Sequence, residues 1–232
     1  MSIVEIKYNL KKDLDNYSYG FLNSRFPDYG QGDLDTAPRM WSTIKKKIEE
    51  TDENKKIEVI EKYLLDNFYE KEVMKLSMEA IDKYWSTIES AYFNKLHNFM
   101  GIKKKIPKID VYFTTLNIYP YNVKGRYFYI PFFAGLAVQA KTIMHESMHL
   151  VFLHNYGQYL SERGIDKQGT LEIAESLTVL LNWEFKEFLL FPERNSKPTT
   201  IDLQKEIVAL YKKNTSFKEI LDRLIELRIM PT

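Results

Sequence analysis

The sequence predicts an α+β fold: a mostly helical N-terminal part, residues 1–105, precedes a part with a small sheet and long helices, residues 106–232. Three observations support this. Apolar residues recur at helical spacing through most of the first hundred positions. Two segments of strand length, 109–118 and 126–133, are rich in aromatic and β-branched residues. A strongly apolar segment with helical character begins near Gly135.

The first forty residues are expected to contain one strand and one helix start. Residues 2–10 alternate loosely between apolar and polar side chains and predict a short strand. Residues 11–35 contain glycine, proline, aspartate and asparagine, which is typical of an irregular segment. A helix is expected to begin near Pro38, with Asp35 or Thr36 as its cap.

A second, longer helix is expected from about Lys71 to Met100, and Gly101 is its stop signal. The basic run 103–105 and Pro107 then mark a break in the chain. Such a run is more often a solvated linker than a site for an anion. We therefore place the boundary between the two parts here.

The two predicted strands come directly after this break. Pro120 and Gly125 lie between the segments 109–118 and 126–133, where a turn belongs. Pro131 cannot donate a backbone hydrogen bond, so the second strand is expected to end there or to lie at a sheet edge.

The C-terminal part is expected to hold three further helices after a polar loop, at residues 171–190, 201–213 and 217–228. Thr170 is the expected cap of the first of them. Ser216 and Glu219 form a capping-box pattern at the start of the last one.

The segment that carries chemistry lies in the apolar helix expected from Gly135 to about Asn155. It reads His145-Glu146-Ser147-Met148-His149, and it uses two of the four histidines in the chain. A helix turns by ~100° per residue, so the two histidines lie ~40° apart, one turn above the other. Two imidazoles on one face can converge on a single metal ion, with Glu146 at the edge of that face.

This residue set points to zinc-dependent hydrolysis. Zinc bound by three protein groups keeps a fourth position for water and lowers the pKa of that water to about 7. Glu146 then acts as the general base and later returns the proton to the departing amine.

The third metal ligand must come from outside the motif. His154 lies about 180° around the helix from His145, so it faces the wrong way. His97 has no ligand-like neighbour in the sequence. Glu172 and Glu175 on the next expected helix are the better candidates.

A His-Glu-x-x-His helix followed by a second helix with a ligand glutamate resembles the gluzincin-type zinc metallopeptidases, the MA clan of peptidases. The run that begins at Glu175, Glu-Ser-Leu-Thr, is similar to the Glu-Gly-Leu-Ala of that group. The resemblance implies a zincin-like catalytic domain with His145, His149 and Glu175 as zinc ligands and Glu146 as base. Glu172 is explained as a first-turn carboxylate that faces the helix dipole, which favours Glu175.

The same resemblance implies two further features. The strand from Arg126 to Phe132 would be the edge strand that aligns a peptide substrate. Gluzincins also use a tyrosine or histidine to steady the oxyanion, and four tyrosines are candidates here, namely Tyr119, Tyr121, Tyr129 and Tyr211. For a group that orients a ligand histidine, Asn182 is a candidate.

Composition excludes several other classes of protein. The net charge of +1 argues against a nucleic-acid binder. The absence of cysteine excludes a disulfide framework and a thiolate metal site, and it fits a reducing compartment. The longest apolar stretch is too short to span a bilayer, and no secretory signal is visible. We expect a cytoplasmic protein.

The predicted function is a zinc metallopeptidase that acts on a peptide or protein substrate, without a nucleic-acid or membrane partner. Two alternatives remain open: a metal-dependent hydrolase of non-peptide amides or esters, and a non-catalytic peptide- or protein-binding module that keeps the fold. The intact Glu146 favours an enzyme over the binding module. The sequence leaves the oligomeric state open.

Overall fold

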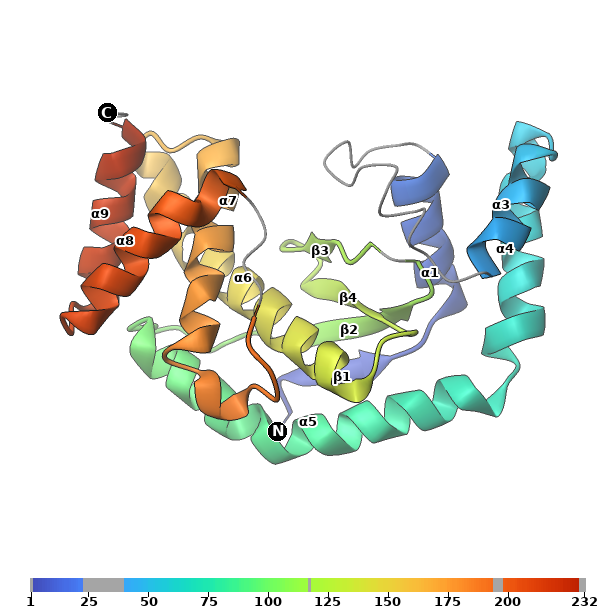
Figure 1. The fold of residues 1–232 in the computed structure, drawn as a ribbon, viewed down its shortest axis with the longest axis horizontal. Coiled ribbons are helices and arrows are strands. Elements are labelled where there is room, and N and C mark those ends of the chain that lie inside the picture. The colour runs from blue at the N-terminus through green and yellow to red at the C-terminus, as the bar shows by residue number, and fades with distance from the viewer. Residues whose placement is uncertain (1, 23–39, 117, 194–197, 230–232) are drawn as a thin grey trace.

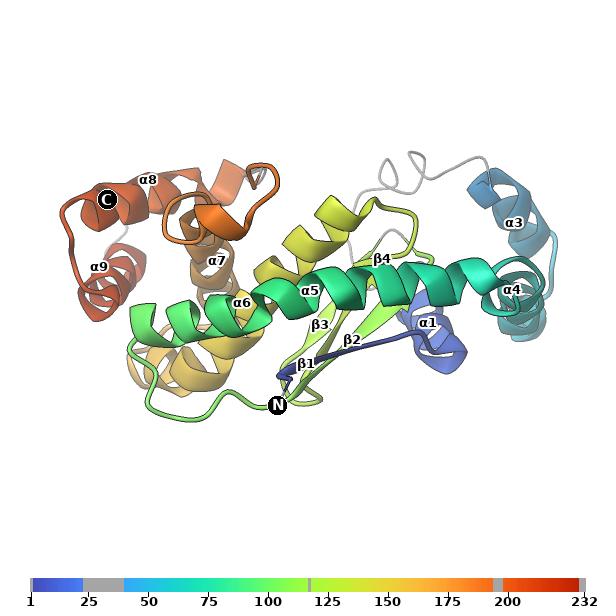
Figure 2. The same ribbon diagram turned by 90° about the horizontal axis from the view of Figure 1, so that it is seen from below.

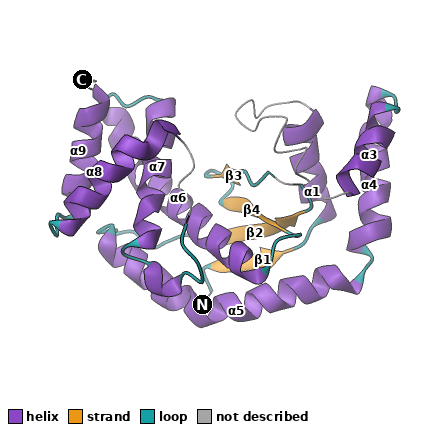
Figure 3. Ribbon diagram, in the orientation of Figure 1, coloured by secondary structure: helices purple, strands orange, loops and turns teal. Residues whose placement is uncertain are grey.

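A four-stranded mixed sheet lies at the centre of the protein (Figure 1). The computed structural model describes residues 2–22, 40–116, 118–193 and 198–229. The strands follow the spatial order β1 (Val4–Lys7), β2 (Ile109–Thr114), β4 (Tyr127–Pro131) and β3 (Tyr121–Asn122). The first three run parallel, and β3 runs antiparallel to β4. The fold is therefore α+β, as the sequence predicts, and helices make up most of it (Figure 3).

Strand β1 comes from the N-terminal residues and pairs with β2. Val4 lies opposite Ile109 and Ile6 opposite Val111, and all four side chains are buried. The prediction of a short strand within residues 2–10 is confirmed. The sheet thus joins a segment from before residue 105 to strands that follow it.

The edge strand next to β4 is β3, and this corrects the expectation that Arg126 to Phe132 forms the edge. Residues 120–125 do not only turn: Tyr121 and Asn122 fold back along β4 and pair with Phe128 and Tyr127. Strand β4 therefore has a neighbour on each side, β2 and β3. It ends at Pro131, as the lack of a proline N–H predicts.

Helices follow β1 directly, so the expectation of an irregular segment from residue 11 is wrong for the described residues up to 22. Helix α1 (Leu10–Asn16) continues into a π-helical turn, Tyr17–Leu22. Its polar residues Asp13 and Asn16 are buried, because both make hydrogen bonds to the end of β2 and to the chain just beyond it. The expected helix start at Pro38, with its caps Asp35 and Thr36, lies outside the described residues.

The next helices lead to α5, the longest element. They are α3 (Met40–Glu49), α4 (Lys56–Leu64) and α5 (Glu72–Phe99). Met100 is the C-cap of α5, and Gly101 follows with a φ of 62°, which confirms the predicted stop. Figure 2, seen from below, shows α5 running along the molecule in front of the sheet, with α3 and α4 at one end and the C-terminal helices at the other.

Helix α6 (Leu136–Glu162) is central and packs against α5 and β4. The Tyr92 hydroxyl of α5 donates a 2.6 Å hydrogen bond to the Met144 carbonyl of α6. Every residue from 143 to 152 except His145 is buried. The helix continues beyond the expected end at Asn155, because the first stop residue with positive φ is Gly164.

Helix α7 (Lys167–Leu177) starts earlier and ends earlier than expected. Asp166 is its N-cap and accepts a 2.7 Å hydrogen bond from the Gly169 amide, so Thr170 is not the cap. A 3-10 turn, Thr178–Asn182, continues it.

Two helices close the chain, α8 (Ile201–Lys212) and α9 (Phe217–Ile229), within a residue of their predicted bounds. The capping box is confirmed. The Glu219 carboxylate accepts hydrogen bonds from the Ser216 amide and hydroxyl, and the Glu219 amide donates one to the Ser216 hydroxyl. Within the described ranges, no helix has both the length and the apolar character that a bilayer crossing needs.

Candidate metal centre

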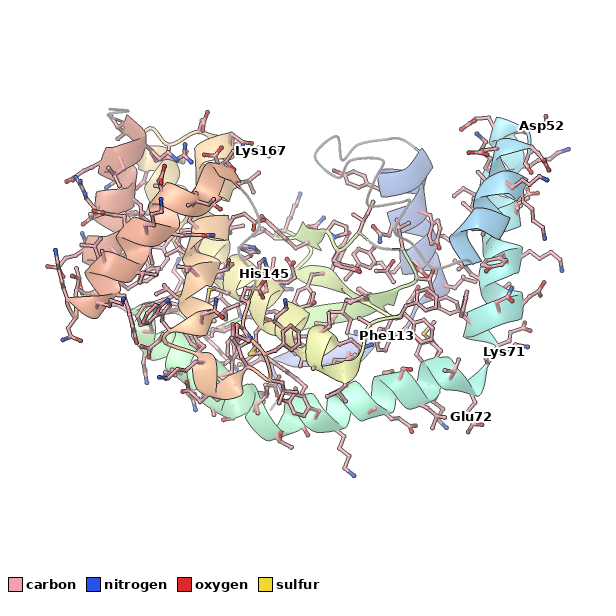
Figure 4. The ribbon with its side chains drawn as sticks, in the orientation of Figure 1. Asp52, Lys71, Glu72, Phe113, His145 and Lys167 are labelled. Carbon is pink, nitrogen blue, oxygen red and sulfur yellow. The ribbon has the colours of Figure 1, made fainter. Side chains whose placement is uncertain are left out.

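The two motif histidines lie on one face of α6, one turn apart. Their Nε2 atoms are 2.9 Å from each other, and their ring centroids are 4.6 Å apart. The His149 side chain is 1% exposed and that of His145 is 19% exposed. Figure 4 labels His145 where α6 passes α7. The apolar residues on each side of the motif are buried. The two histidines therefore lie where water has only limited access.

Glu175 of α7 completes a group of three donors. Its Oε1 lies 3.7 Å from His149 Nε2, and its Oε2 lies 3.8 Å from His145 Nε2. One ligand atom from each of these three residues lies within 4.8 Å of the others. The structure therefore brings together the three residues that the sequence proposes as ligands, and this group could hold a metal ion.

The spacing of the three donors fits a tetrahedral ion. Zinc bonds of about 2.0–2.1 Å to imidazole and carboxylate would hold the donor atoms ~3.3 Å apart. The distances of 2.9, 3.7 and 3.8 Å fall on both sides of that value. Three protein donors on a tetrahedral ion would leave a fourth position for water or substrate.

Glu172 faces away from the histidines. Its carboxylate forms an ion pair with Arg228 of α9, and it accepts a 2.9 Å hydrogen bond from Gln168. Because α7 begins at Lys167, Glu172 is not in the first turn, so the helix-dipole explanation for it is wrong. Its partner on α9 explains it instead.

The other two histidines are not part of the group. His154 is exposed on α6, and His97 is half-buried in the last turn of α5. Among the described residues, the set that could hold a metal ion contains His145, His149 and Glu175 alone.

Glu146 is 9% exposed on α6, next to His145 in the chain. It lies ~100° around the helix from His145, so it borders the face of the two histidines without belonging to it.

Of the candidate tyrosines, Tyr121 contacts the site. Its ring centroid is 5.4 Å from that of His149, at an interplanar angle of 33°. The hydroxyls of Tyr129 and Tyr211 donate instead to the Lys12 carbonyl and to Glu184, at 2.9 and 2.8 Å. Burial raises the pKa of Tyr119 to about 12.

Sequence reasoning missed one residue of the site, Glu193. Its Oε1 lies 3.9 Å from His145 Nδ1, and its Oε2 lies 3.3 Å from Lys141 Nζ. Burial raises the pKa of the Glu193 carboxyl; Lys141 opposes this rise and Glu175 adds to it. No sequence motif marks Glu193, because it lies in a non-helical segment. The one signal in the sequence was Lys141, a positive charge one helical turn before His145 that calls for a nearby carboxylate.

Asn182 contacts this segment rather than a histidine. Its Oδ1 accepts a 2.7 Å hydrogen bond from the Glu193 amide, and its Nδ2 donates a 2.9 Å hydrogen bond to the Glu193 carbonyl. The expectation that Asn182 orients a ligand histidine directly is therefore corrected: it holds the backbone of Glu193, whose carboxylate lies beside His145.

Comparisons with protein-family models, with curated proteins and with solved structures find no match to this chain. The functional argument therefore starts from the residues of the site.

Proposed function

We propose that this protein is a zinc-dependent hydrolase of the gluzincin type that cleaves peptide bonds. His145, His149 and Glu175 would hold the metal, and Glu146 would be the general base. The observation that carries the proposal is the convergence of three donor atoms within 4.8 Å, two of them from a His-Glu-x-x-His helix.

The donor set supports zinc. Two imidazole nitrogens and one carboxylate oxygen form a common ligand set of catalytic zinc, and three protein ligands leave one position for water or substrate. When bound, zinc supplies a Lewis acid that polarises the substrate carbonyl and makes water acidic near neutral pH.

The position of Glu146 in the motif supports its proposed role as the general base. Glu146 would take the proton of the attacking water and then give a proton to the nitrogen that leaves as an amine. Its position beside the ligand face lets it act without occupying a coordination position. Glu146 is only 9% exposed, so bulk water has little access to it.

The sheet edge supports a peptide substrate over a small amide. Strand β3 is the last strand in the order β1-β2-β4-β3, next to β4. The backbone groups of such an edge can bind an extended chain by strand addition. Tyr121 of this strand packs beside His149, so a chain bound there would pass close to the metal ligands.

The test combines metal analysis with a peptide-library digest of the wild-type chain and Glu146→Gln. We expect about one zinc per chain in both proteins and cleavage by the wild type alone, because the variant keeps the ligands but lacks the base. Glu162→Gln, at the exposed end of the same helix, is the matched control and should cleave normally.

Two results would contradict the proposal. A wild-type chain that neither contains nor takes up zinc would remove the metal site. Equal cleavage by Glu146→Gln would remove Glu146 from the role of base.

A further inference from the structure

Glu193 lies beside a metal-ligand histidine although it is outside the motif. In His145, Nε2 faces His149 and Glu175, and Nδ1 lies 3.9 Å from Glu193 Oε1. The Glu193 side chain is only 10% exposed. A carboxylate this close to the second ring nitrogen is one small rotation from accepting its proton in a hydrogen bond.

The backbone of Glu193 is held in place from α7. Asn182 bonds to both the amide and the carbonyl of Glu193, at 2.7 and 2.9 Å. Asn182 ends the 3-10 turn that continues α7, the helix of Glu175. One continuous segment therefore places both the ligand carboxylate and the carboxylate beside His145.

Lys141 directs the other oxygen of Glu193. Its Nζ lies 3.3 Å from Glu193 Oε2 and 4.9 Å from the centre of the Phe191 ring. Lys141 and His145 are one turn apart on α6, so the two oxygens of Glu193 reach two neighbouring residues of that helix face. This leaves Oε1 for the imidazole.

We propose that Glu193 is a positioning residue for the metal centre: it accepts a hydrogen bond from Nδ1–H of His145 and thereby keeps Nε2 unprotonated, the form that binds a metal. The inference rests on the proposed metal site. Histidine ligands commonly donate their other N–H to a carboxylate, and loss of that partner typically weakens metal binding about 10- to 100-fold.

The first measurement is the zinc dissociation constant of the full chain, by competition with a chromophoric chelator. We expect Glu193→Ala to bind zinc about 10- to 100-fold more weakly. Glu193→Gln keeps an oxygen acceptor and should recover part of the loss. Glu187→Ala is the matched control, because Glu187 lies in the same segment but pairs with Lys95, and it should bind zinc normally.

The second measurement is the ¹⁵N NMR spectrum of the imidazole of His145 in metal-free protein. We expect the Nδ1–H tautomer in the wild type and a mixture of tautomers in Glu193→Ala. If Glu193→Ala fails to fold, Asn182→Ala replaces it, because it releases the Glu193 backbone and should shift affinity and tautomer in the same direction.

Unchanged zinc affinity and an unchanged tautomer in these variants would overturn the inference. Failure of the proposed function gives a different result. A wild type that binds zinc but cleaves no peptide refutes the peptidase and leaves the role of Glu193 intact. A wild type that binds no zinc refutes the metal site, and the tautomer then decides whether Glu193 orients His145.

Discussion

Two glutamates three positions apart on α7 have different surroundings. Glu175 points at the histidine pair, with its oxygens 3.7 and 3.8 Å from the two Nε2 atoms. Glu172 points at α9 and pairs with Arg228. Residues three apart on a helix are offset by ~60°, and here that offset is enough to separate a site residue from a structural ion pair.

Glu175→Ala and Glu172→Ala should therefore fail in different ways. Glu175→Ala removes a proposed ligand and should weaken zinc binding by at least about 100-fold, because it would take away one of three bonds. Glu172→Ala should leave zinc affinity unchanged and lower stability by about 1 kcal/mol, since it leaves Arg228 without its carboxylate. Chelator competition and urea unfolding measure the two effects, and the reverse order would exchange the assignments.

Helix α1 is attached to the sheet by a buried carboxyl group. Asp13 accepts hydrogen bonds of 2.7 Å from the hydroxyls of both Thr114 and Thr115 and one of 3.2 Å from Tyr69. Burial raises the pKa of Asp13 to about 6, and the hydrogen bonds from the two threonines and Tyr69 limit the rise. Elements far apart in sequence thus meet at one titrating group.

This group makes stability depend on pH. The pKa of an unfolded aspartate is about 3.9, so between roughly pH 4 and pH 6 the unfolded chain loses the Asp13 proton before the folded chain does. The folded state therefore becomes less stable as pH rises through that window. By neutral pH the free energy of unfolding has fallen by roughly 3 kcal/mol. Urea unfolding of the wild type and of Asp13→Asn gives the free energy of unfolding of each protein at each pH. The difference between the two isolates the contribution of the Asp13 carboxyl. A difference that does not change between pH 4 and pH 7 would contradict the raised pKa.

At the scale of the whole molecule, the sheet and the hydrophobic core both contain residues from before and from after position 105. Strand β1 pairs with β2, and α5 packs on α6, the helix that carries the two histidines. One continuous cluster of buried side chains includes Val4, Trp85, Phe113 and Leu177. The N-terminal residues therefore build the platform that carries the site.

We expect a fragment of residues 106–232 not to fold alone. It lacks β1, so β2 would expose an unpaired edge, and it lacks α5, so the buried face of α6 would meet water. Circular dichroism of the fragment should show little cooperative thermal unfolding, whereas the full chain should unfold in one transition. A stably folded fragment would support two independent domains divided near residue 105.

The sequence by itself determined the fold class, the long helix before Gly101, both main strands and the helix that carries the two histidines. It could do so because periodicity and capping are local: a helix face, a positive-φ glycine and a capping box each depend on residues close in sequence. The pairing of His145 with His149 is of this kind, since one helical turn is enough to align them.

Only the tertiary structure decided how segments distant in sequence meet. It placed Glu175 beside the histidines and Glu172 on α9, put β3 rather than β4 at the edge, and brought Glu193 to His145. Helix α1 was missed for the same reason, because its buried Asp13 and Asn16 are satisfied by β2 and the residues just after it, about a hundred positions away. Such contacts depend on the packing of the whole chain, and a local pattern does not contain them.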